Sequence, residues 1–199
     1  MKLQDVELFI QDENEDGVFA VSVVESPAIE ENFIALSTHK MELKVVDEDK
    51  KIVTGLALVP DKRIYRKMKL KEGEEPKEFN IYFSKETISK TAELFMKKLN
   101  LNNITSEHEK PVTGVTVIES WVVEDTDKDK TALYNLKAPV GSWAITMKVY
   151  NEEEWSKIKA GDYKGFSIEG IYQGMDALNM SKDLDIIEQL KHILDENTK

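Results

Sequence analysis

Short runs of hydrophobic residues, many alternating with polar ones, recur along most of the chain. This pattern is typical of strands, and β-branched residues are frequent within the runs. We expect strands at residues 6–10, 18–24, 41–46, 51–59, 112–123, 142–149 and 165–172. Pro60 closes the fourth of these, because proline cannot donate a hydrogen bond to a sheet.

Three other segments carry the helical period. The first, residues 84–99, starts at Ser84, a residue suited to capping a helix. Its apolar stripe consists of Ile88, Ala92, Phe95 and Leu99. The second follows Asn151 with three glutamates, a capping-box pattern, and stops at Gly161. The third, residues 181–194, has leucines and isoleucines along one face.

The order of these elements predicts an α+β fold. Several consecutive strands have no helix between them, which favours a mostly antiparallel, barrel-like sheet with a few flanking helices over a doubly wound parallel sheet. We expect one domain at residues 1–176, with a linker and an amphipathic C-terminal helix at 177–199. That helix is too short to be stable alone. It would pack on the barrel or on a helix of a partner protein.

Composition excludes several classes of protein. The chain has 199 residues with 27 Lys+Arg and 38 Asp+Glu, a net charge of −11 that argues against a general nucleic-acid binder. With no cysteine it has no disulfide, thiolate metal site or cysteine nucleophile. No apolar run approaches the roughly 20 residues of a membrane-spanning helix. The acidic start lacks the features of a secretion signal, so we expect an intracellular protein.

One basic stretch stands out in this acidic chain. Residues 61–71 read DKRIYRKMKLK. We interpret them as a solvated hairpin that balances nearby acids. Docking to an acidic scaffold or contact with a substrate polypeptide is the alternative, and nucleic acid is disfavoured because Tyr65 is the only aromatic residue in the stretch.

Two places carry candidate chemistry. Ser167 stands between large apolar residues in a run flanked by Gly165 and Gly170, and glycines permit the close backbone approach that a nucleophile strand needs. The histidines are His39, His108 and His192. Among them His108 lies at the edge of a strand, whereas the other two lie in polar surroundings. No H-E-x-x-H pattern is present, which argues against a zinc protease.

The combination of several stretches resembles the phage prohead (capsid maturation) serine proteases, and within them the XkdF-like branch. These stretches are residues 106–108 (SEH), 117–121 (VIESW), 141–143 (GSW) and 155–170 (WSKIKAGDYKGFSIEG). The resemblance implies a β-barrel related to that of the herpesvirus assembly proteases. It also implies that Ser167 is the nucleophile and His108 the base, with no metal or organic cofactor.

The resemblance does not supply the third catalytic residue. Many members carry a Val-Ser-Leu-Val-like strand after the nucleophile, and an acidic residue precedes that strand. In this chain a similar string stands before the nucleophile, at residues 21–24, which suggests a circular permutation. Ala20 stands where the acidic residue would be. We favour Glu119, because a carboxylate within an apolar run needs a partner such as an imidazolium. A Lys or Arg at a sheet edge is the alternative partner. Glu169, two residues from Ser167 on the same strand face, is the second candidate.

The expected function is therefore that of a prohead maturation endopeptidase. It would act in the host cytoplasm, inside the procapsid, on phage scaffold and major capsid precursor proteins, as a monomer or a homodimer. The resemblance also implies self-cleavage at an apolar-x-Glu pattern, which residues 186–188 fit. The alternative is a non-catalytic structural or assembly protein of the virion built on the same fold.

Overall fold

The computed structural model describes residues 3–25, 43–69, 73 and 75–178. Several expectations lie outside these residues: the C-terminal helix at 181–194, the cleavage pattern at 186–188, His39 and His192. Within the described residues no helix is long and apolar enough to cross a membrane.

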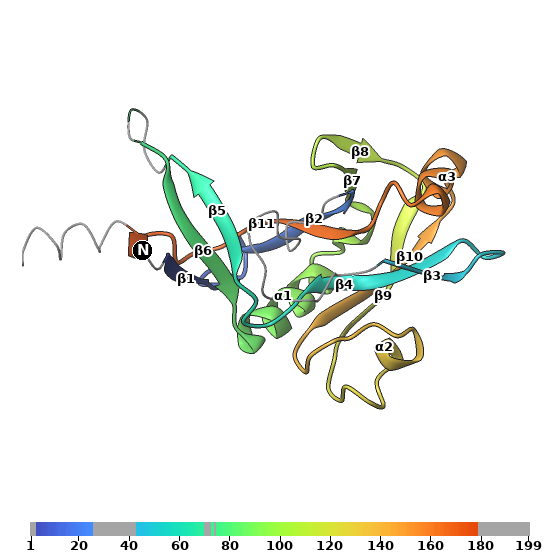
Figure 1. Ribbon diagram of the computed structural model, residues 1–199, viewed down its shortest axis with the longest axis horizontal. Helices are drawn as coiled ribbons and strands as arrows, with labels where there is room; N and C mark the ends of the chain where they lie inside the picture. The colour runs from blue at the N-terminus through green and yellow to red at the C-terminus, as the bar shows by residue number, and fades with distance from the viewer. Residues whose placement is uncertain (1–2, 26–42, 70–72, 74, 179–199) are drawn as a thin grey trace, which may run out of the picture.

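Three sheets make up most of the described chain (Figure 1). The first has the order β1 (Gln4–Leu8), β6 (Lys77–Phe83), β5 (Ile64–Met68). The second has the order β3 (Lys44–Asp47), β4 (Ile52–Leu58), β10 (Trp143–Val149), β9 (Val115–Val122). The third has the order β11 (Gly165–Ile171), β2 (Gly17–Val24), β7 (Ile104–Ser106), β8 (Lys110–Val112).

Few helices accompany the sheets within the described residues. They are α1 (Lys85–Lys97), α2 (Lys130–Leu133), α3 (Glu152–Ala160) and the 3-10 turn η1 (Asn100–Asn102). The mixed α+β class is therefore confirmed. The sheets do not join into one closed barrel among the residues described, so the barrel stays a prediction. Two strand pairs, β1–β6 and β2–β7, are parallel and the other pairs are antiparallel, in keeping with the mostly antiparallel pairing expected from the sequence.

The two long helices begin where their caps predict. The Oγ of Ser84 accepts a hydrogen bond from Thr87 N at 3.3 Å, and α1 then buries Ile88, Ala92 and Phe95. Leu99 departs from the expected stripe, because α1 ends at Lys97 and Leu99 adopts a left-handed conformation with 77% of its surface exposed. Asn151 caps α3 in the same way through two backbone N–H groups.

The core lies between the sheets and α1. Trp143 of β10 packs edge-on against Phe95 of α1, with ring centroids 5.2 Å apart, and both are fully buried. Phe166 of β11 and Phe79 of β6 are buried equally deeply. The third sheet is thereby fixed on one side of a continuous core, which gives β11 a rigid support.

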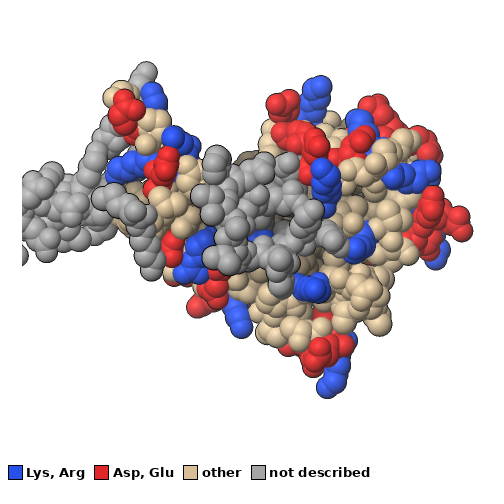
Figure 2. Space-filling model, viewed as in Figure 1, with Lys and Arg blue, Asp and Glu red and all other residues tan. Residues whose placement is uncertain are grey.

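The basic stretch forms β5 of a hairpin with β6, which extends from one end of the molecule (Figure 1). Arg63 pairs with Asp5 at 3.1 Å, and Lys67 pairs with Glu78 at 2.7 Å. The structure therefore agrees with the interpretation of a hairpin that balances nearby acids. Figure 2 shows basic and acidic residues interspersed over the visible described surface.

Candidate active site

The candidate nucleophile lies in the middle of the third sheet's outer strand. In β11, Ser167 faces Ser22 of the antiparallel strand β2, and Ser22 in turn pairs with Thr105 of the parallel strand β7. Paired residues on neighbouring strands project to the same face of a sheet. Three hydroxyl side chains therefore form a row across β11, β2 and β7, and only 4% of Ser167 is exposed.

The candidate base occupies a tight turn directly after β7. Glu107 and His108 both adopt left-handed backbone conformations, with φ of 53° and 59°. Three backbone N–H groups hold this turn: Glu107 N donates to Val23 O, Glu109 N donates to Ser106 O, and His108 N donates to the side-chain Oγ of Ser22 at 3.0 Å. The turn thus fixes the histidine backbone to β2, the strand that faces the nucleophile. Left-handed backbone conformations are costly for residues other than glycine, so these hydrogen bonds are needed to hold Glu107 and His108 in them.

An acid orients the imidazole of His108. Its Nδ1 lies 3.1 Å from Oε1 of Glu169, and since a carboxylate only accepts, Nδ1 carries the proton. The hydroxyl of Thr105 donates to the same oxygen. Glu169 is two residues beyond Ser167 in β11, so both side chains project from one face of the strand. His108 and Glu169 are therefore in contact on the face of the third sheet toward which Ser167 also projects.

Glu119, the acid favoured from sequence, lies in a different sheet. It is paired in β9, and the ammonium of Lys130 donates to its carboxylate. This hydrogen bond and the Thr146 hydroxyl lower the pKa of Glu119, with partial burial opposing them. Because β9 is an outer strand of the second sheet, this is the lysine partner at a sheet edge that the sequence left as an alternative. Within the described residues Glu119 makes no hydrogen bond to His108.

The Ser167 hydroxyl makes no side-chain hydrogen bond to any described residue, including His108. Catalytic hydrogen bonds are often loose in structures without substrate. The flanking Gly170 has a packing role, because a Cβ there would lie 2.8 Å from Gly17 O of the adjacent strand. Close packing against Gly17 therefore explains why residue 170 is a glycine, and no oxyanion site is needed to explain it.

Sequence reasoning overlooks two residues of this arrangement. Ser22 holds the turn of His108, and Thr105 holds the carboxylate of Glu169. Ser22 had a detectable signal, because it lies in the Val-Ser-Val-Val string that resembles a family strand. Thr105 had none, since its position beside Glu169 depends on the register of three strands that are distant in sequence.

No group of three metal-ligating side chains is found among the residues described. On this face of the third sheet, the groups that could take part in a reaction are the hydroxyl of Ser167, the imidazole of His108 and the carboxylate of Glu169. Residues 40–176 match a family model described as "Putative phage serine protease XkdF". The chain belongs to this family. The match confirms the resemblance drawn from the sequence motifs, and Ser167, His108 and Glu169 all lie inside the matched span.

This member of the XkdF family has two further strands, β1 and β2, before that span. The family match starts at residue 40, whereas β2 precedes it and pairs with the candidate nucleophile strand. Neither the curated proteins nor the solved structures that were compared match the chain.

Proposed function

We propose that the protein is a serine endopeptidase of the prohead type, in which Ser167 is the nucleophile, His108 the general base and Glu169 the acid that orients His108. The observation that carries this assignment is the contact of 3.1 Å between His108 Nδ1 and Glu169 Oε1. It leaves Nε2 of the imidazole unprotonated and able to accept the proton of a hydroxyl on the same sheet face.

The reaction would follow the usual course of acyl transfer. Nε2 of His108 takes the proton of Ser167 as Oγ attacks the scissile carbonyl, and the resulting imidazolium is stabilised by Glu169. His108 then protonates the leaving amine, which releases the first product and leaves an acyl-enzyme. A water molecule, deprotonated by His108, hydrolyses the ester and restores the serine.

The substrates proposed for this site are phage scaffold and major capsid precursor proteins, cleaved inside the procapsid in the host cytoplasm. Family membership supports a phage protease, and the prohead resemblance of the motifs supports these substrates. Self-cleavage would follow from the same chemistry wherever a flexible segment of the chain reaches the site.

A second candidate is a non-catalytic virion protein on the same fold. The observation in its favour is the state of Ser167, a residue only 4% exposed whose hydroxyl makes no hydrogen bond to His108 or to any other described residue. In this case the contact of His108 with Glu169 would serve stability alone.

Ser167→Ala distinguishes the two candidates. Wild type and variant are incubated with a scaffold or capsid precursor and followed by intact mass, with Ser156→Ala on the exposed face of α3 as the matched control. We expect fragments with wild type and Ser156→Ala and none with Ser167→Ala. Labelling by a fluorophosphonate, which needs an activated serine but no protein substrate, should show the same pattern. Absence of both cleavage and labelling in wild type would support the structural role.

A further inference from the structure

Tyr163 connects the two strands that flank β2 in the third sheet. It is buried and stands two residues before β11, the strand that carries Ser167 and Glu169. Its hydroxyl lies 2.8 Å from Oγ of Ser106, the last residue of β7. β11 and β7 lie on opposite sides of β2. This hydrogen bond therefore joins, across β2, the start of the nucleophile strand to the end of the strand that leads to His108.

Ser106 is also the first residue of the turn that holds His108. Its carbonyl accepts the hydrogen bond from Glu109 N that closes the turn around Glu107 and His108. Only three residues separate β7 from β8. Because the connection is so short, the position of Ser106 limits where the imidazole of His108 can lie.

The hydrogen bonds of Tyr163 have a definite direction. Its hydroxyl donates to Oε2 of the buried Glu154 at 2.7 Å, since a carboxylate only accepts. Burial raises the pKa of Tyr163, so the phenol keeps this proton. Its oxygen is then left to accept from Ser106. The other oxygen of Glu154 accepts from Lys157 at 2.9 Å, so α3 holds the carboxylate that fixes Tyr163.

This network lies behind the candidate site. Ser106 alternates with Thr105 along β7, so their side chains project from opposite faces of the sheet. On the face of the candidate site, Thr105 donates to the carboxylate of Glu169. On the other face, Ser106 donates to Tyr163. The end of β7 is thus tied toward β11 on both faces, which holds His108 within reach of Glu169.

We propose that Tyr163 is a positioning residue of the protease, whose hydroxyl acts through Ser106 to hold the turn of His108 where the imidazole contacts Glu169. Tyr163 itself transfers no proton to or from the substrate. The inference rests on the proposed function for its effect on cleavage. Its effect on the imidazole can be measured without a substrate.

Steady-state cleavage of one peptide, taken from a cut site mapped in a capsid precursor, tests the effect on the reaction. Tyr163→Phe should lower kcat by roughly 10- to 100-fold and leave KM within about twofold of wild type, because a small displacement of the base slows the reaction without removing a substrate contact. Ser106→Ala should act alike, and it carries the test if Tyr163→Phe does not fold. Ser106→Thr, which keeps a hydroxyl, should retain most of the activity.

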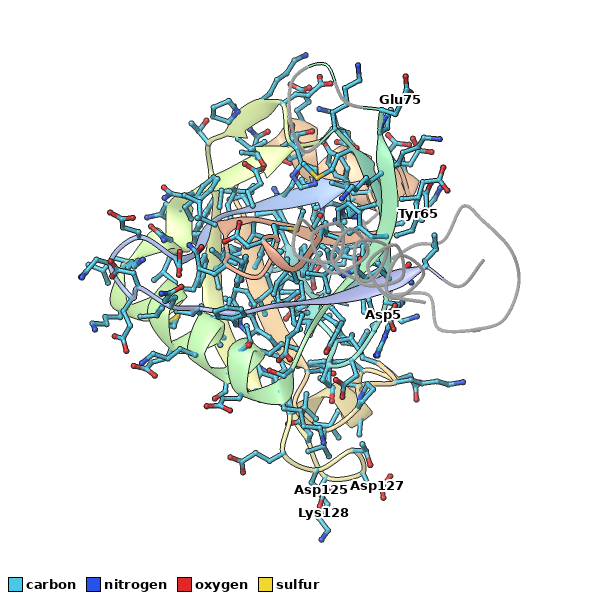
Figure 3. All side chains as sticks on the ribbon, turned by 90° about the vertical axis from the view of Figure 1, so that its left-hand side faces the viewer. Asp5, Tyr65, Glu75, Asp125, Asp127 and Lys128 are labelled. Carbon is cyan, nitrogen blue, oxygen red and sulfur yellow. The ribbon has the colours of Figure 1, made fainter. Side chains whose placement is uncertain are left out.

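Two other tyrosines provide matched controls. Tyr172→Phe removes a similar contact between hydroxyl groups, 3.1 Å from Thr91 of α1. Tyr65, labelled in Figure 3, lies on β5 in another sheet and is 43% exposed. Tyr172→Phe and Tyr65→Phe should both keep kcat close to that of wild type, which separates positioning of His108 from the general loss of a tyrosine hydroxyl.

NMR of the ring nitrogens of His108 supplies a measurement that needs no activity. In the inactive Ser167→Ala protein, Nδ1 should be protonated and Nε2 unprotonated, with the signals assigned by their loss in His108→Gln. Addition of Tyr163→Phe should give a mixture of both tautomers, because the contact with Glu169 is no longer held. Addition of Tyr172→Phe should not.

The two measurements separate this inference from the proposed function. A tautomer of His108 that is unchanged by Tyr163→Phe, or a loss of kcat no larger than in Tyr172→Phe, would overturn the inference. A change of tautomer in a protein that shows no Ser167-dependent cleavage would support the positioning role of Tyr163 and contradict the proposed function.

Discussion

At the scale of single residues, one carboxylate oxygen organises the candidate site. Oε1 of Glu169 accepts from both the Thr105 hydroxyl and the His108 imidazole. Thr105 therefore limits where the carboxylate can lie, and the carboxylate in turn sets the tautomer and the plane of the imidazole. This is the arrangement that a general base requires, because it presents an unprotonated nitrogen in a fixed direction.

We expect Glu169→Gln to reduce kcat by roughly 100- to 10,000-fold, since an amide can no longer enforce the tautomer or stabilise the imidazolium. Glu119→Gln removes only an ion pair with Lys130 and should leave kcat close to that of wild type. Steady-state cleavage of one peptide by both variants measures the difference. A larger loss in Glu119→Gln would return the catalytic role to Glu119.

The choice between these acids shows what sequence reasoning reaches at this scale. Motif resemblance selects Ser167 and His108, and strand alternation makes Glu169 a candidate. The sequence cannot show that His108 bends back over β11, because the contact requires β2 to lie between β7 and β11. A carboxylate within an apolar run can be paired by a lysine as well as by an imidazolium, and Lys130 is the partner that Glu119 has.

At the scale of elements, local signals specify the helices better than the strands. Caps at Ser84 and Asn151 place the starts of α1 and α3, because capping depends on a few adjacent residues. The expected strand at 112–123 instead divides into β8 and β9 at Gly114, whose φ is +75°. The sequence predicts a hairpin at residues 61–71 but no strand at 77–83, where β6 buries Phe79, Ile81 and Phe83 in alternation with Asn80 and Tyr82.

The end of α1 yields a prediction about stability. Leu99 takes the left-handed conformation that usually falls to glycine after a helix, and its side chain is 77% exposed. Leu99→Gly should therefore raise the free energy of unfolding by about 0.5–1 kcal/mol. Leu99→Ala keeps the strain and should change little. Urea denaturation of both variants measures this, and a destabilised glycine variant would contradict the assignment.

The loop between β1 and β2 yields a prediction about pH. The buried carboxylate of Asp16 accepts from Gln11 N and Asp12 N, and from the amide of Gln173. Burial raises the pKa of Asp16, but these hydrogen bonds outweigh burial and leave the pKa below its ordinary value. A lowered pKa favours the folded, ionised form. The resulting stability is present above about pH 4 and is lost as the pH falls through the pKa of the folded state.

Asp16→Ala should accordingly lower the free energy of unfolding by about 2 kcal/mol at neutral pH, the cost of leaving buried donors without an acceptor. The difference from wild type should shrink in acid. Denaturation curves at pH 7 and pH 3 provide the comparison. A difference that does not depend on pH would show that the charge of Asp16 is unimportant.

At the scale of the whole molecule, sheets are joined by contacts between distant parts of the chain. The parallel pairs β1–β6 and β2–β7 and the short bridge from Phe9 to Gln173 connect the beginning of the chain with its middle and end. Hydrophobic patterns predict strands but not which strands become neighbours. For this reason the α+β class follows from the sequence, whereas the three-sheet arrangement does not.

Gly174 tests the importance of one such junction. Its φ is +114°, and a Cβ at this position would lie 2.1 Å from Glu7 O of β1. Gly174→Ala should therefore cost about 3 kcal/mol or more, because backbone must move to admit the methyl group. Gly161→Ala also places alanine at positive φ, 78°, but in open space, and should cost about 1 kcal/mol. Thermal unfolding measures the stability of both variants, and an equal loss of stability in the two would contradict the close approach of Gly174 to Glu7 O.

The hydrogen bond from His108 N to Ser22 Oγ, over 86 positions of the chain, has a consequence for synthesis. A growing chain on the ribosome acquires β2 first, then the turn of His108, and β11 only near the end of the described residues. Neither the base nor the nucleophile has its final surroundings until β11 has been added beside β2. The proposed protease therefore cannot act before β11 has been translated and has paired with β2, and neighbouring polypeptides stay intact until then.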